Sequence, residues 1–160
     1  MLLKVLRSAD FKQLPGLFWL ALSHPLFIVP TLKASRKTML IAQREYGDAH
    51  KGNTKANAFR HALWNVLIAK DCLQWRDNFE DVLIWTEKIT AKHEKLAPNK
   101  LLPRAMDLHN NKIGLDHCKE LVNKEETEIV EFLKKMAKKA QKIEQVAEIK
   151  NAAQNLVYIT

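Results

Sequence analysis

Glycine is scarce in this sequence, with only four among 160 residues, and no glycine-rich loop motif is present. Sandwiches and barrels use glycine in their many turns, so the scarcity argues against both. The absence of GxGxxG and GxxxxGK[ST] strings excludes the common dinucleotide-binding and P-loop classes. The sequence also contains no internal repeat.

Cysteine is nearly absent as well, since Cys72 and Cys118 are the only two. Two thiols are too few for a disulfide framework or a cysteine-type zinc site. They could form a single bridge, but we favour two free, half-buried thiols, because free cysteine behaves as a small hydrophobic residue. A chain of this length, 47% hydrophobic and 28% charged, is typical of one globular domain over residues 1–160.

The net charge of +8 is concentrated near the N-terminus. Residues 1–60 contain ten basic and three acidic groups, a net charge of +7, whereas residues 61–160 contain sixteen and fifteen. Such an excess favours an anionic substrate, a lipid surface or a protein partner. Nucleic acid is a weaker interpretation, because the basic residues are not interleaved with the aromatics that single-strand binders need.

The longest uncharged stretch lies between Lys12 and Lys33 and reads QLPGLFWLALSHPLFIVPTL. Its 20 residues could just span a bilayer, but three prolines and a histidine interrupt it. Three interpretations stay open for residues 12–33: a membrane span, a membrane-touching segment flanked by basic residues, or a buried core helix. No pattern of a cleavable signal peptide is present. We therefore expect a protein that is cytoplasmic or is secreted without such a signal. In both cases the protein could contact a membrane peripherally.

The pattern of apolar residues and caps predicts an all-α bundle of about six or seven helices. Thr54 or Asn53 is expected to cap a central helix, and the segment from Glu125 to Tyr158 is expected to form one long helix or two. A heptad-type seam supports the last helix. The expected helical ranges are 8–13, 16–24, 30–46, 54–74, 78–96, 104–110, a short helix ending at Val122, and 125–158.

Polar residues of unusual kind gather in three segments of the middle third. Asn57, His61 and Asn65 are spaced four residues apart, which places them on one face of a helix. Because buried polar groups must be paired, such residues would form one network if they are interior. The other members are Arg60, His93, Glu94, Asp107, His109, Asn110 and Asn111.

This set of side chains is typical of a metal site or an acid–base site. His61, His93, Asp107 and His109 could hold a divalent metal of the zinc or manganese type, with Glu94 as general base or fourth ligand. Without a metal, His61 or His109 would act as general base, poised by Glu94 or Asp107. Arg60 would face an anion in either version. The amides expected to hold waters or orient the ligands are Asn57, Asn65, Asn110 and Asn111.

The motif NAFRHALWN at 57–65, followed by His93-Glu94 and by MDLHNNKIG at 106–114, resembles a bacterial family of small helical domains of unknown function. Members of that family occur alone and at the ends of toxin-like secreted proteins. The resemblance implies a bacterial origin, a helical fold and a shared polar site, with residues 57–114 as its core. It supplies no reaction.

We therefore carry two hypotheses. The first is a hydrolase, in a metal-assisted or metal-free version, that acts on a phosphate-bearing or lipid-linked substrate and serves as an antibacterial effector. The second is a non-enzymatic binding module, whose polar cluster is structural and whose basic N-terminal surface docks on a membrane or protein partner. Analysis of bound metal would discriminate between them.

Overall fold

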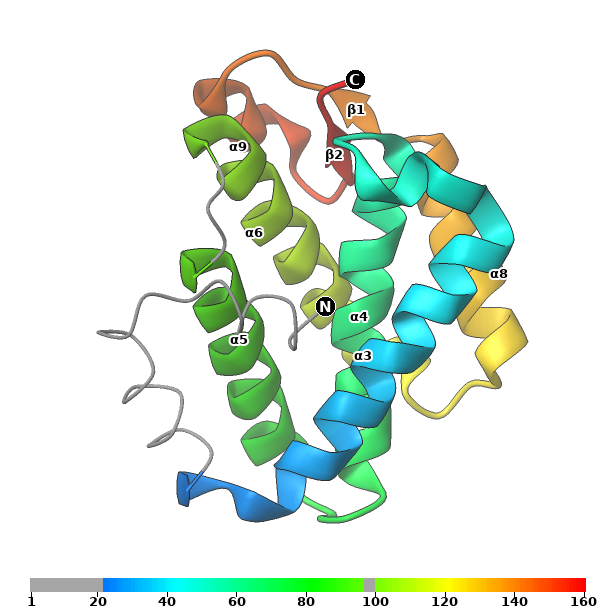
Figure 1. Ribbon diagram of the computed structural model, residues 1–160, viewed down its shortest axis with the longest axis vertical. Helices are drawn as coiled ribbons and strands as arrows, with labels where there is room; N and C mark the ends of the chain where they lie inside the picture. The colour runs from blue at the N-terminus through cyan, green and yellow to red at the C-terminus, as the bar shows by residue number, and fades with distance from the viewer. Residues whose placement is uncertain (1–21, 97–99) are drawn as a thin grey trace.

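The computed structural model describes residues 22–96 and 100–160, and it confirms the predicted all-α single domain (Figure 1). Seven α-helices lie in these residues, five of them with thirteen residues or more, beside a small parallel sheet. The elements are α3 (Pro25–Tyr46), η2 (Gly47–Lys51), α4 (Lys55–Leu73), α5 (Phe79–Leu96), α6 (Leu101–Asp116), α7 (Cys118–Leu121), α8 (Glu126–Lys138), β1 (Gln141–Lys142), η3 (Val146–Glu148), α9 (Ile149–Ala152) and β2 (Val157–Tyr158).

Helix α4 is the centre of the bundle, with α3, α5, α6 and α8 packed around it. Fifteen of its nineteen residues are buried, which explains why its sequence is apolar on almost every side. The predicted cap is confirmed for Thr54, whose hydroxyl accepts a hydrogen bond from the backbone N–H of Asn57. The motif at 57–65 therefore starts within the first turn of a helix that is buried along most of its length.

Helix α3 differs from its expected bounds. Pro25 is the first residue of this helix, because a residue at the first helical position needs no N–H donor, and the preceding helical segment ends at Ser23, close to its predicted end. Pro30 lies inside α3 and is buried, at the cost of one backbone hydrogen bond. The helix predicted over 8–13, and most of that predicted over 16–24, lie outside the described residues.

The chain after Lys138 corrects the prediction of a helix as far as residue 158. The polypeptide leaves α8 and becomes extended, and the backbone N–H groups of Gln141 and Ile143 donate to carbonyls of Leu156 and Tyr158. Ile143 is buried in a small apolar cluster with Met106, Ala152 and Val157. The predicted heptad-type seam therefore does not continue as a helix beyond α8, because Ile143 reaches the core from an extended segment and Ala147 is exposed.

The apolar segment 12–33 lies only partly within the described residues. Its described part includes the beginning of α3, where Phe27 and Thr31 are buried while Leu26, Val29 and Leu32 are exposed. None of the helices in the described ranges has the length and hydropathy that crossing a membrane requires. Both cysteines are free and buried.

Candidate functional site

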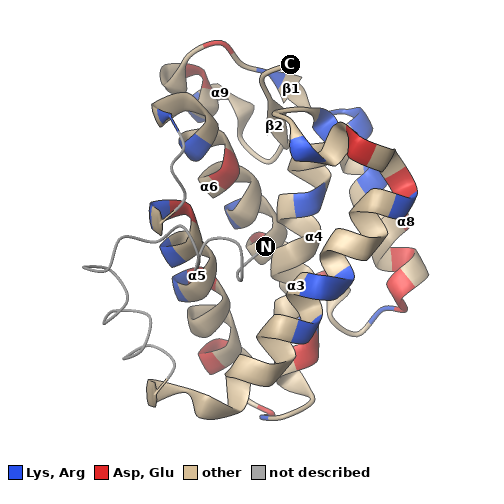
Figure 2. Cartoon of the chain, viewed as in Figure 1, with Lys and Arg blue, Asp and Glu red and all other residues tan. Residues whose placement is uncertain are grey.

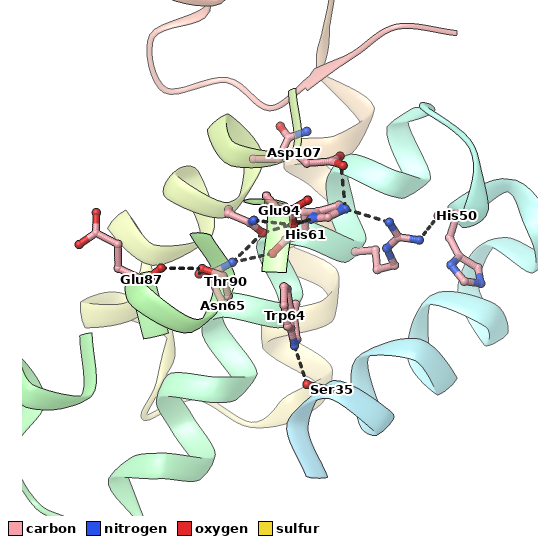
Figure 3. A network of polar contacts seen from close by, with 12 residues as sticks. Ser35, His50, His61, Trp64, Asn65, Glu87, Thr90, Glu94 and Asp107 are labelled. Carbon is pink, nitrogen blue, oxygen red and sulfur yellow. Dashed lines mark hydrogen bonds and ion pairs between the residues drawn. The ribbon is translucent and has the colours of Figure 1, made fainter. Parts of the chain in front are cut away.

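Three helices bring their polar residues together in the interior of the domain (Figure 3). Helix α4 contributes His61 and Asn65, α5 contributes Glu94, and α6 contributes Asp107 and Asn111. All five residues are buried, and each is at most 5% exposed. The three segments therefore meet in one buried network.

His61 occupies the middle of this network. The guanidinium Nη2 of Arg60 lies 2.8 Å from Nε2 of His61, and a guanidinium can only donate, so Nε2 carries the lone pair. The proton is therefore on Nδ1, which donates to Oδ1 of Asn111 at 3.1 Å. Burial, followed by the charge of Arg60, holds the pKa of His61 well below its usual value. His61 is thus a neutral imidazole whose Nε2 is available as an acceptor or a metal ligand.

Asn111 is held by three partners. Its Oδ1 accepts from Nδ2 of Asn65 at 2.9 Å as well as from His61, and its Nδ2 donates to Oε1 of Glu94 at 3.1 Å. Thr90 in turn donates to Oδ1 of Asn65 at 3.2 Å. This chain of amides fixes the imidazole orientation and the position of the Glu94 carboxylate before any ligand arrives.

Glu94 and Asp107 are buried carboxyl groups close to the same imidazole. Oε1 of Glu94 lies 3.5 Å from Nδ1 of His61, and Oδ1 of Asp107 lies 3.3 Å from Nε2. Burial, together with the charge of Asp107, raises the pKa of Glu94 to about 8, and burial raises the pKa of Asp107 to about 7. Arg60 lowers both pKa values, and Arg104 also lowers that of Glu94. Burial outweighs these charges, so a bound proton, or a divalent ion in its place, would stabilise the two carboxyl groups.

A metal ion could be held by His61, Glu94 and Asp107. Each of them offers one ligand atom, and these atoms all lie within 4.8 Å of one another. Ligands of a tetrahedral ion with bonds of ~2.1 Å lie ~3.4 Å apart, which is close to the 3.3 Å between His61 and Asp107. One imidazole nitrogen and two carboxylate oxygens suit zinc or manganese.

A small pocket of about 140 Å³ reaches the network from between α5 and α6. Asn65 and Asn111, which position His61, line it together with Thr90, and Glu87 and Lys112 also line it. Since water occupies ~30 Å³ in the liquid, the pocket has room for a few waters or one small anionic group. A small polar ligand could therefore reach the amides beside His61 without passing through the core.

The comparison with protein-family models matches residues 18–141 to a family described as "Domain of unknown function (DUF6973)". The chain belongs to the DUF6973 family. The match extends on both sides of the motif-bearing region 57–114, so it also covers α3 and α8. No curated protein and no solved structure matches the chain.

The structure sorts the predicted ligands of this DUF6973 domain into two groups. His61 and Asp107 lie together, and Glu94 completes their group. His93 and His109 lie outside it, which corrects the ligand set expected from the sequence. His93 packs edge-on against Trp64, with ring centroids 5.0 Å apart, and burial lowers its pKa to about 4. Nε2 of His109 is 2.9 Å from the carbonyl oxygen of Asn155, so it braces the C-terminal segment.

The polar residues of the motif MDLHNN therefore lie on two faces of α6 and make different contacts there. Asp107 and Asn111, four residues apart, face His61. Asn110 instead exchanges two hydrogen bonds of 2.9 Å with the backbone of Val157, which anchors strand β2. Asn57 is buried in the first turn of α4, and its Oδ1 has no hydrogen-bond partner among the described residues. Its predicted role of holding a water stays a prediction.

Two groups that support the buried network were not predicted from the sequence. The carbonyl oxygen of His50 accepts from Nη1 of Arg60 at 2.7 Å, which turns the guanidinium toward His61. Thr90 supports Asn65 from helix α5. The contact of a backbone carbonyl group cannot be predicted from residue types. Thr90, however, precedes Glu94 by one helical turn, and this spacing indicates that the two side chains share a helix face.

The raised and lowered pKa values predict that the metal-free DUF6973 domain is most stable at mildly acidic pH, between about pH 4.5 and 6.5. In that range the protons that the unfolded chain binds at its histidines offset those that folded Glu94 and Asp107 retain, and at lower pH the histidine effect alone remains, so stability falls with falling pH. Above pH 6.5, folded Glu94 and Asp107 retain protons that the unfolded chain has lost, so stability falls by about 2–3 kcal/mol toward pH 8.5. Urea unfolding with a chelator present would measure both limbs.

The variant Asp107→Asn isolates the alkaline limb. It removes one raised carboxyl group and also the negative charge that helps to raise the pKa of Glu94. We expect a clearly shallower decline above pH 6.5. Stability that keeps rising through pH 8 in the parent chain would contradict the proposed burial of two protonated carboxyl groups.

Proposed function

We propose that this DUF6973 domain is a metal-assisted hydrolase whose divalent ion is held by His61, Glu94 and Asp107. The observation that carries the proposal is the buried group of one imidazole and two carboxyl groups with ligand atoms within 4.8 Å. Two carboxylates and one imidazole leave at least one coordination position open for water. An ion held by these three residues would lower the pKa of a water bound at the open position, and this would make the water a better nucleophile near neutral pH.

The hydrogen bonds around His61 resemble those that orient a metal-binding histidine. A ligating histidine usually donates its other ring N–H to a fixed acceptor, and here Nδ1 donates to Asn111. Asn111 also holds Glu94, so one amide orients two of the three ligands. The roles predicted for Asn65 and Asn111 are consistent with this arrangement, whereas Asn110 serves the fold.

Arg60 competes with the ion in this proposal. Its guanidinium donates to the same Nε2 lone pair that a metal would use, so a metal would have to displace that hydrogen bond. The displaced guanidinium would remain anchored to the carbonyl of His50, beside the ion. That position suits it to bind the anionic oxygen of a phosphate ester, the substrate class that Arg recognises well.

The small pocket between α5 and α6 has room for a compact phosphate group beside Asn65 and Asn111, and neither the three proposed ligands nor Arg60 lines it. Its volume of about 140 Å³ admits such a group but not an acyl chain. A lipid-linked substrate would therefore enter by its phosphate end only. The role of antibacterial effector rests on the resemblance alone and stays a prediction.

A second candidate function is a binding module with a structural polar core. The near-complete burial of the network favours it, because His61 and Glu94 are each only 1% exposed. In that case the hydrogen bonds specify how α4, α5 and α6 pack, and no ion is needed.

Metal titration decides between the two. Zinc or manganese added to the chelator-treated full chain should bind at one equivalent, raise the melting temperature and release protons, because the carboxyl groups must ionise. Asp107→Asn should weaken binding by roughly a hundredfold or more. Asp71→Asn is the matched control, because Asp71 is also a buried aspartate of the bundle but lies outside the cluster.

Activity follows from the same samples. Nitrophenyl phosphate mono- and diesters should be hydrolysed by the metal-loaded parent and the Asp71→Asn variant, and not by Asp107→Asn. A chain that binds no ion, yet unfolds cooperatively with the predicted pH maximum, would favour the binding module over the hydrolase.

A further inference from the structure

One outward face of helix α3 has no partner among the described residues. Leu26, Val29, Lys33, Arg36 and Leu40 recur at spacings of three and four residues, so they share one side of the helix. All five are exposed, with Leu26 at 53%, Val29 at 59% and Leu40 at 63%. We call these five residues the outer α3 face.

The outer α3 face carries only apolar and basic side chains. Helix α3 has no acidic residue before Glu45, near its C-terminal end, and Figure 2 shows blue segments along it. Lys37 is paired with Glu126, but neither Lys33 nor Arg36 makes an ion pair with a described residue. Water-facing helix surfaces usually carry mixed polar side chains, so this face is matched to a partner that is both apolar and negatively charged.

Further exposed apolar groups lie at the N-terminal end of α3. Leu22 precedes the helix and is 54% exposed. Arg76, in the turn after α4, borders the same small pocket as Leu26 and Phe27, so this turn lies beside the beginning of α3. Trp75 in the same turn is 55% exposed. Indole rings are preferred at the boundary between lipid and water.

We propose that the outer α3 face binds an anionic lipid surface. The apolar end, with Leu22, Leu26 and Val29, would enter the headgroup boundary, while Lys33 and Arg36 would lie at the level of the phosphates. Arg76 contributes less, because it is paired with Asp81. Charge complementarity selects this occupant, since a neutral apolar partner would bury two cations that make no ion pair with a described residue, although Asp71 attracts Lys33 from a longer distance. The inference does not depend on the metal site.

Vesicle cosedimentation of the full chain tests the proposal. Vesicles of phosphatidylcholine with phosphatidylserine should bind the protein, and those of phosphatidylcholine alone should bind it much more weakly. Lys33→Gln combined with Arg36→Gln should reduce binding about thirtyfold at low salt, since each basic residue contributes a factor of about five. Added salt should weaken the parent in the same direction. Leu26→Ser combined with Val29→Ser should also reduce binding about tenfold or more.

Two matched variants control for net charge and for exposed hydrophobicity. Lys135→Gln with Lys138→Gln removes the same charge from exposed positions of α8, and Leu101→Ser alters a residue that is 76% exposed on α6. Both should bind as the parent does. Equal binding to neutral and anionic vesicles, equal losses in the α8 variant, or no binding at all would overturn the proposal. Concentration-dependent dimerisation that the Leu26 and Val29 substitutions abolish would assign the face to a second copy instead.

Discussion

Replacing Gly114 by alanine should unfold the domain or destabilise it by ~3 kcal/mol or more. A Cβ at this position would lie 2.4 Å from the carbonyl oxygen and 2.6 Å from the Cα of Ala62. These are backbone atoms of α4, so no side-chain rotation can relieve the overlap. Helices α4 and α6 would have to separate where His61, Asp107 and Asn111 meet. Thermal and urea unfolding of Gly114→Ala would measure the effect.

Gly52→Ala is the matched control for this prediction. Its Cβ would meet the methyl group of Thr54 at 3.5 Å and the carbonyl oxygen of Ala49 at 4.0 Å, which are ordinary contact distances, and Gly52 has a negative φ of −89°. We expect a change in unfolding free energy within about 0.5 kcal/mol. A Gly114→Ala variant as stable as the Gly52→Ala variant would show that the close contact of α4 and α6 is not required.

The contact at Gly114 shows what the sequence could predict about the site. The polar residues of α4 and α6 fall at helical spacing, so their faces follow from the sequence alone. The glycine at the end of MDLHNNKIG was part of the recognised motif, but its reason is a close approach to Ala62 that no local pattern encodes. Which histidine faces the carboxyl groups depends on how α5 and α6 are rotated against α4. For that reason the sequence could not show that Glu94, and not its neighbour His93, belongs to the cluster.

The C-terminal segment shows where local patterns fail. Residues 115–160 contain no glycine and no proline, so nothing in the sequence interrupts the expected helix at Lys138. The chain becomes extended because Ile143 and Val157 are buried beside Met106, and because Asn110 bonds the backbone of Val157. These are tertiary contacts with α6, and they outweigh the helical preference of the segment.

The pair His61→Ala and Trp64→Ala should separate function from packing. His61→Ala should abolish metal binding and reduce hydrolysis about a hundredfold or more, because it removes a ligand and the group that Asn111 orients. Trp64 is fully buried, and its Nε1 donates to Oγ of Ser35 at 2.8 Å, so its loss leaves a cavity and removes one of the two hydrogen bonds of that hydroxyl. Trp64→Ala should cost ~3–5 kcal/mol of unfolding free energy.

Metal-free His61→Ala should lose much less stability than Trp64→Ala. Arg60 keeps the attraction of Asp107 and Glu94 when the imidazole is removed, and Oδ1 of Asn111 still accepts from Asn65. Groups retained for chemistry often cost stability rather than supply it. Trp75→Ala, at a site 55% exposed, controls for the loss of an indole and should be nearly neutral. If His61→Ala instead unfolds as readily as Trp64→Ala, the network is structural, and the binding module becomes the better account of this domain.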